Sequence, residues 1–233
     1  MLFGWFYFDW TVLIVLPALI ISIWAQIKVH TTYEKYAKVY TRRGMTGADT
    51  ARRILDSHGL QHIRIEHIRG HLTDHYDPRA NVIRLSDSVY GSVSAAAIGV
   101  AAHEAGHAVQ HATGYFPIRV RAAVIPATRF GSMLAIPIFM IGLILAAPSL
   151  LLAGIALYAL VAFFQLVTLP VEFNASSRAI AVLRSSGMLS EEELSASKQV
   201  LTAAALTYVA ALLTSLLTLL RLVILAGGAN RRR

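Results

Sequence analysis

The sequence contains no cysteine among its 233 residues. Disulfides and thiolate metal ligands are therefore excluded, and any metal ion must be held by His, Asp or Glu side chains. Charged residues are also scarce, at 15% of the chain, against about 25% in an average soluble domain. Only 13 residues are acidic, whereas 21 are Lys or Arg, which gives a net charge of +8. Together with a hydrophobic content of 56%, this scarcity of charge indicates a membrane protein.

Long apolar runs account for this composition. About 20 mostly apolar residues cross the hydrocarbon core of a bilayer, and four stretches meet this condition: Trp10–Val29, Gly131–Ala147, Ser149–Leu169 and Leu201–Ala226. The second and third are joined by the short, uncharged sequence AAPSL, which predicts a helical hairpin. The first run lacks the basic segment and the small-residue cleavage site of a signal peptide, so it is predicted to be a retained anchor.

The predicted fold class is mainly α, a multi-span membrane protein that carries a small α+β polar domain. Five segments follow from the pattern: an anchor at 1–29, the polar domain at 30–130, a two-helix hairpin at 131–169, a linking helix at 170–200, and a C-terminal apolar helix with a basic tail at 201–233. In the polar domain, Thr46 is predicted to cap a short helix and Ser92 a longer helix that reaches Gly114. Alternating apolar residues predict short strands around Ile63 and at Val82–Leu85.

The distribution of basic residues predicts the orientation. Five basic residues follow the first span, namely Lys28, Lys35, Lys38, Arg42 and Arg43, while Asp9 precedes it. The positive-inside rule then places the N-terminus outside and the polar domain in the cytoplasm. The same rule disfavours an external basic tail, which four full crossings would require, so the side of the C-terminus stays open. A basic face near lipid is typical of attraction to anionic headgroups, and no partner nucleic acid is expected.

The sequence His103-Glu104-Ala105-Gly106-His107 is an H-E-x-x-H motif in a predicted helix. Residues four apart lie on one helical face, so both imidazoles can reach one metal ion. Glu104, next to the first histidine, can then take a proton from water activated by that metal. The alternative is a polar helix face with incidental histidines, and the placement of the motif in a capped helix favours the metal site.

A catalytic zinc ion needs a third protein ligand. His111 is excluded, because it lies about 12 Å along the helix axis from His103. The metzincin pattern is excluded because Thr113 stands where its third histidine would be. Five further histidines fall in predicted strand, turn and helix-end segments and are expected at the surface rather than at a second metal site: His58, His62, His67, His71 and His75. Acidic residues remain, and Glu172 stands beside Pro170, which is predicted to end the third span and to precede a new helix.

Several motifs together carry a family resemblance. H-E-x-x-H followed much later by E-x-x-A-S, at Glu172–Ser176, is similar to the gluzincin pattern of membrane peptidases of the HtpX type. LTDHYDP (Leu72–Pro78), RLS (Arg84–Ser86), AAHEAGHAVQ (Ala101–Gln110) and VEFNASSRA (Val171–Ala179) resemble the YugP-type neutral zinc metallopeptidases of bacterial membranes. The resemblance implies a zincin-like polar domain that binds one Zn²⁺ per chain. It implies His103, His107 and Glu172 as the zinc ligands and Glu104 as the general base.

The resemblance also implies supporting roles. Ser176 occupies the place where related families have an Asp that orients a ligand histidine, so a hydrogen bond without a charge is expected there. Arg178 is a candidate for stabilising the oxyanion, with an ion-pair or headgroup arginine as the equal alternative. In related peptidases the strand before the active-site helix pairs with extended substrate, and the matching residues here are Val82, Ile83, Arg84 and Leu85.

The predicted function is that of a zinc-dependent endopeptidase embedded in the bacterial inner membrane, with its active site on the cytoplasmic side. Its expected partners are membrane-associated or unfolded protein substrates and the lipid bilayer. One alternative is an intramembrane protease of the site-2 type, which takes an Asp ligand from a later span, yet no Asp follows Asp87. Another is a non-catalytic scaffold or chaperone with a structural zinc, in which Glu104 has no role.

Overall fold

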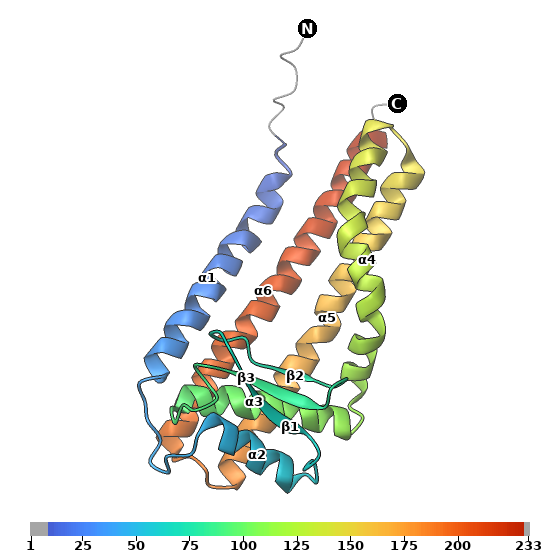
Figure 1. The fold of residues 1–233 in the computed structure, drawn as a ribbon. Helices are drawn as coiled ribbons and strands as arrows, with labels where there is room; N and C mark the ends of the chain where they lie inside the picture. Colours follow the sequence, from blue (N-terminus) through green and yellow to red (C-terminus); the bar gives the residue numbers. More distant parts are fainter. Residues whose placement is uncertain (1–8, 231–233) are drawn as a thin grey trace. The chain divides into compact units, whose positions relative to one another are not determined.

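The computed structural model describes residues 9–230, so Arg231–Arg233 of the basic tail lie outside the described residues. Six helices and three strands follow one another along the chain (Figure 1): α1 (Val12–Tyr36), α2 (Gly47–Ser57), β1 (Arg64–Ile68), β2 (His75–Asp77), β3 (Val82–Ser86), α3 (Ala95–Ala112), α4 (Phe116–Ile144), α5 (Pro148–Ser185) and α6 (Glu191–Asn230). The predicted fold class, mainly helical with a small sheet, is confirmed.

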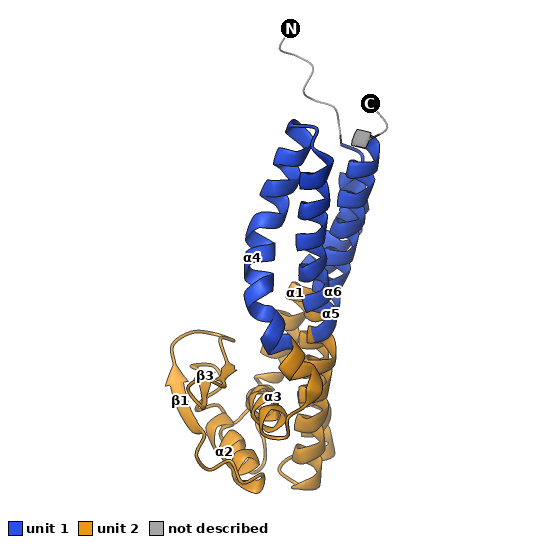
Figure 2. Ribbon diagram, turned by 90° about the vertical axis from the view of Figure 1, so that its right-hand side faces the viewer, with its two compact units in different colours: residues 1–24, 121–167, 209–233 blue, residues 25–120, 168–208 orange. Residues whose placement is uncertain are grey.

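Four of the helices, α1, α4, α5 and α6, are long and apolar enough to cross a membrane. Each extends beyond the apolar run that predicted it into more polar sequence. The chain divides into two compact units, one formed by residues 1–24, 121–167 and 209–233, and the other by residues 25–120 and 168–208 (Figure 2). We refer to them as the apolar unit and the site unit.

The apolar unit contains the predicted hairpin. α4 and α5 are joined by residues 145–147 only, and glycines let the two helices approach closely. A Cβ atom added at Gly154 would lie 2.9 Å from the carbonyl oxygen of Ala135. Phe139, Leu151 and Leu222 form the buried apolar cluster of this unit.

The site unit is built around α3, which packs against α2, β2 and β3. Ser94 caps α3 by accepting a hydrogen bond from the N–H of Ala97 at 3.2 Å, so the cap lies two residues after the one predicted at Ser92. Gly106 packs closely against α5, because a Cβ atom there would lie 2.8 Å from the carbonyl oxygen of Ala175. The glycine therefore lets the helix that carries the H-E-x-x-H motif lie directly against α5.

The three strands form one sheet in the order β1-β3-β2, with β1 parallel and β2 antiparallel to β3. Ile83 of β3 is therefore flanked by Ile65 on one side and Tyr76 on the other. The expectation that Val82–Leu85 pairs with substrate requires a free edge on this strand. In the structure, β3 is instead paired with β1 on one side and β2 on the other. β3 is the central strand of the sheet, and four of its five residues are buried, as expected for a strand covered on both faces. The edge strand that contacts α3 is β2.

Pro170 does not end a helix, contrary to the prediction. It lies inside α5, which continues without interruption to Ser185. Proline in a helix interior costs about 3 kcal/mol, but four residues after it recur at every fourth position and are each at most 1% exposed: Val171, Ala175, Ala179 and Leu183. Full burial of one Val or Leu side chain contributes about 1.5–3 kcal/mol, so this stripe offsets the local cost.

Candidate metal centre

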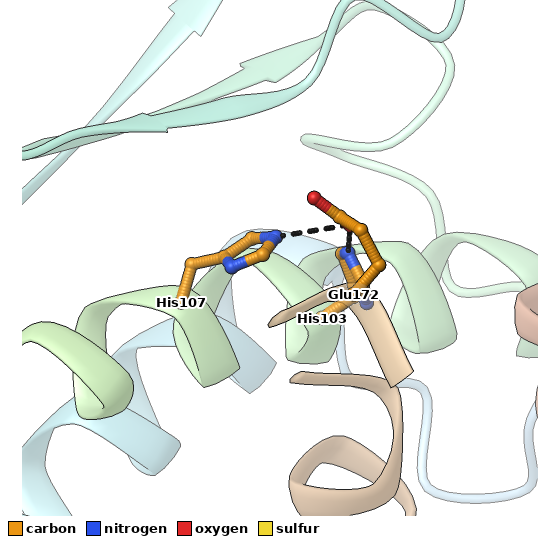
Figure 3. A group of neighbouring side chains, drawn as sticks. All are labelled: His103, His107 and Glu172. Atoms are coloured by element: carbon orange, nitrogen blue, oxygen red, sulfur yellow. Dashed lines mark hydrogen bonds and ion pairs between the residues drawn. The ribbon is translucent and has the colours of Figure 1, made fainter. Parts of the chain in front are cut away.

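Two helices bring three potential ligands together in the site unit. His103 and His107 project from α3 toward Glu172 on α5 (Figure 3). Nε2 of His103 lies 3.2 Å from Oε2 of Glu172, and Nε2 of His107 lies 3.4 Å from the same oxygen. The three ligand atoms all lie within 4.8 Å of one another. Among residues 9–230, no other group of His, Cys, Asp and Glu side chains meets this condition.

The second nitrogen of each histidine is held by a neighbouring side chain. Nδ1 of His103 lies 3.1 Å from Oγ of Ser176, the residue expected to orient a ligand histidine. Nδ1 of His107 lies 3.0 Å from Oε1 of Gln110. Both rings therefore turn Nε2, and not Nδ1, toward Glu172.

The surroundings of Gln110 fix the protonation of His107. The Gln110 amide nitrogen donates to the carbonyl oxygen of Val171 at 2.7 Å and to Oδ1 of Asn174 at 3.0 Å. A backbone carbonyl can only accept, so the amide oxygen of Gln110 must be the atom that faces His107. Nδ1 of His107 then carries the proton, and the lone pair of Nε2 is free for a metal ion.

The electrostatics of the cluster favour a cation. The Glu172 side chain is 4% exposed, and those of the two histidines are 14% and 13% exposed. Burial on its own lowers the pKa of His107, but the hydrogen bond to Glu172 and the negative charges of Glu104 and Glu172 outweigh it and raise that pKa. A buried carboxylate between two imidazoles with oriented Nε2 atoms is a donor set that fits zinc.

Glu104 lies beside the three ligands and not among them. Its Oε2 accepts a hydrogen bond of 2.9 Å from the backbone N–H of Tyr76 in β2. Glu104 lines a cavity of about 420 Å³ together with His103 and Glu172. Asp74 lines the same cavity, and burial together with the charge of Glu104 raises its pKa although hydrogen bonds from Ser86 act against the shift.

The structure does not bring every predicted residue to this cluster. Arg178 donates from Nε to Oδ1 of Asn174 at 2.8 Å and lies over the Tyr115 ring, and it does not line the cavity that contains Glu104. This position gives the oxyanion role no support. His111 packs edge-on against Tyr76, in agreement with its exclusion as a ligand.

Three contributions were missed from the sequence. Gln110 stands three residues after His107, so both lie on one face of α3, and this spacing was the available signal. The backbone N–H of Tyr76 left no signal, because a main-chain contact does not depend on residue type. Asn174 was also missed, since its role depends on how α3 and α5 face each other.

Comparisons with known proteins identify the family of the chain. A family model described as "Putative neutral zinc metallopeptidase" matches residues 11–227. The protein described as "Putative membrane protease YugP" from Bacillus subtilis (strain 168) is 49% identical over 214 residues, which cover 92% of this chain and 95% of that protein. No solved structure matches the chain. Because the family model and this relative each extend over most of its length, the chain belongs to the neutral zinc metallopeptidase family.

Proposed function

We propose that this protein is a membrane-embedded, zinc-dependent endopeptidase that hydrolyses peptide bonds of membrane-associated or unfolded proteins. The observation that carries the proposal is the convergence of His103, His107 and Glu172 beside Glu104 in one cavity. A structural zinc site needs only ligands, whereas Glu104 adds a carboxylate that is not one of the three. The oriented histidines and the extra carboxylate are together what a hydrolytic site requires.

The proposed ligands of one zinc ion per chain are Nε2 of His103, Nε2 of His107 and the carboxylate of Glu172. When bound, zinc acts as a Lewis acid that polarises a peptide carbonyl and makes water nucleophilic near neutral pH. Ser176 and Gln110 hold the two imidazoles in the orientation that this binding needs.

Glu104 is proposed as the general base and acid. Its carboxylate accepts a proton from the attacking water while the oxygen of that water bonds to the carbonyl carbon. It then delivers the proton to the nitrogen of the leaving amine as the carbon–nitrogen bond breaks. The Tyr76 N–H bond holds one carboxylate oxygen, which fixes the position of this proton carrier at the edge of the sheet.

The open edge of β2 is the proposed site for the substrate backbone. Tyr76 is the middle residue of this three-residue strand, and its N–H points away from β3 and donates to Glu104. The backbone carbonyl of Tyr76 is therefore the group that this edge offers to a substrate N–H. Main-chain pairing along such an edge recognises extended peptide without reading its sequence. This assignment replaces Val82–Leu85, whose neighbours on both sides are already strands.

The proposed location is the bacterial inner membrane, with the site on the cytoplasmic side. Four candidate spans support the multi-pass arrangement, and basic residues after the first span support the orientation through the positive-inside rule. α3 is not among the candidate spans, which disfavours an intramembrane protease of the site-2 type. The test is hydrolysis of casein by the purified full-length chain. Hydrolysis that requires zinc supports the proposal, and a zinc-loaded chain without hydrolysis would favour a scaffold.

Replacing Gln110 by Met is expected to weaken zinc binding roughly 10- to 100-fold, the usual loss when an outer partner of a ligand histidine is removed. Gln110 is fully buried, and Met has a similar length but no strong acceptor for Nδ1 of His107. Competition with a chelator measures the affinity. Gln61→Met is the matched control, because Gln61 is exposed and donates only to the backbone of Asp56. Equal affinities of the two variants would contradict the role of Gln110.

A further inference from the structure

The cavity beside the proposed metal centre has two chemically different parts. His103, Glu104 and Glu172 line one part. The N-terminal part of α6 supplies an apolar wall whose lining residues are Val200, Leu201, Ala204 and Ala205. Val29 of α1 and Val100 of α3 add further apolar surface. A reactive centre thus opens directly onto an apolar surface inside the site unit.

The cavity is large enough for part of a peptide. Its volume of about 420 Å³ falls within the roughly 300–1,000 Å³ typical of ligand pockets. Two small residues, Ala204 and Ala205, stand where larger side chains would fill the space. Ala204 is only partly buried, so its methyl group borders free volume.

The rim of the cavity is held by hydrogen bonds from the loop between β1 and β2. The N–H of Gly70 donates to Asp87 at 2.8 Å, and the carboxylate of Asp74 accepts from the N–H of Ser86 at 2.7 Å. His71 from this loop stacks on His30 of α1 with ring centroids 6.3 Å apart. These contacts hold in place the loop that contributes His71 and Asp74 to the lining.

Polar residues also line the cavity, among them Gln26, His30, Thr207 and Tyr208. The wall formed by Val200, Leu201, Ala204 and Ala205, by contrast, offers little to a charged side chain. No Lys or Arg is among the described residues that line the cavity. Asp74, a carboxylate outside the metal cluster, already accepts hydrogen bonds from both the N–H and the hydroxyl of Ser86. A charged substrate group placed against the α6 wall would lose its hydration without finding a partner, which is costly. An apolar side chain gains free energy on the same surface.

We propose that this cavity binds an apolar substrate side chain next to the scissile bond, and that Ala204 limits the size of that side chain. The inference rests on the proposed peptidase function and adds its substrate class. The bound residue is large and apolar, of the Leu or Phe type, and lies between the α6 wall and Val29. Recognition of one such side chain together with main-chain pairing selects apolar, extended segments, which unfolded and membrane proteins expose.

Binding of dipeptide hydroxamates to the zinc-loaded full-length chain tests this proposal without requiring hydrolysis. The probes differ in one side chain, which is Gly, Ala, Leu or Phe. The wild type is expected to bind the Leu and Phe compounds about tenfold or more tightly than the Gly compound. Ala204→Leu is expected to reduce this preference about tenfold, because its side chain occupies the same volume.

A second variant changes the opposite wall of the cavity, and a control variant changes an exposed position of α6. Val29→Ala widens the cavity and is expected to shift the preference from Leu toward Phe. Thr202→Leu adds bulk to the exposed face of the same helix and is expected to leave the preference unchanged. Equal binding of all four probes by the wild type, or an unchanged preference in both Ala204→Leu and Val29→Ala, would overturn the inference. Hydrolysis without side-chain preference contradicts only this inference, whereas preference without hydrolysis contradicts only the proposed peptidase function.

Discussion

Replacing Glu104 by Gln is expected to reduce peptide hydrolysis by a factor of about 10²–10⁴, the usual contribution of a general acid–base residue, while zinc stays bound. The substitution keeps the size of the side chain and removes its ability to carry the proton. Glu104 is not among the three side chains that converge as potential ligands, so we expect the metal affinity not to depend on it. The zinc content and the rate of casein hydrolysis are measured on the same preparation. The first checks that the metal stays bound, and the second checks that hydrolysis is lost.

Glu34→Gln is the matched control for this substitution. Glu34 is exposed on α1, and the same change of charge there is expected to leave both the rate and the zinc content unaltered. Full activity of the Glu104 variant would show that another group moves the proton. Loss of zinc from that variant would instead make Glu104 a ligand.

Replacing Glu172 by Ala is expected to remove zinc from the protein at stoichiometric concentrations. Glu172 supplies the one carboxylate of the cluster, and its Oε2 lies within 3.4 Å of Nε2 of both histidines. Its loss leaves two neutral imidazoles, so the affinity should fall by more than the roughly 10- to 100-fold that an outer partner contributes. Metal analysis after dialysis measures the effect.

Glu191→Ala serves as the control for Glu172→Ala. Glu191 stands at the start of α6, where its exposed side chain lies 3.7 Å from Arg184, and exposed pairs of this kind contribute little to stability. This variant is expected to keep its zinc. Full zinc occupancy in Glu172→Ala would exclude Glu172 as a zinc ligand. A residue other than Glu172 would then have to complete the site with the two histidines.

The metal centre was largely predictable because most of its geometry is local. The four-residue spacing of His103 and His107 places both rings on one face of any helix, whatever surrounds it. The position of Glu172 came from a resemblance rather than from spacing, since its distance from α3 depends on how two helices pack. Gln110 shares the local spacing and was overlooked, while the hydrogen bond from Tyr76 to Glu104 depends on the path of a strand.

Two expectations were drawn from local sequence although tertiary packing decides them, namely the helix end at Pro170 and the pairing of Val82–Leu85 with substrate. The predicted strand at Val82–Leu85 is itself confirmed. Pro170 is a strong helix breaker by itself, yet the buried stripe from Val171 to Leu183 keeps α5 continuous. The alternating residues of Val82–Leu85 predict a strand, but they do not indicate whether that strand lies at the centre or at the edge of a sheet. By contrast, the predicted cap at Thr46 is confirmed, because its reciprocal hydrogen bonds with Asp49 involve residues only three apart.

Zinc-edge X-ray absorption of the loaded full-length chain counts and identifies the ligands of the bound metal. We predict one zinc per chain with two imidazole nitrogens at about 2.0–2.1 Å and protein carboxylate oxygen at about 2.0–2.2 Å. In Glu172→Ala reconstituted at high zinc concentration, the spectrum should lose the carboxylate and keep both imidazoles. A wild-type spectrum with three or more imidazoles, or one that Glu172→Ala leaves unchanged, would contradict the account.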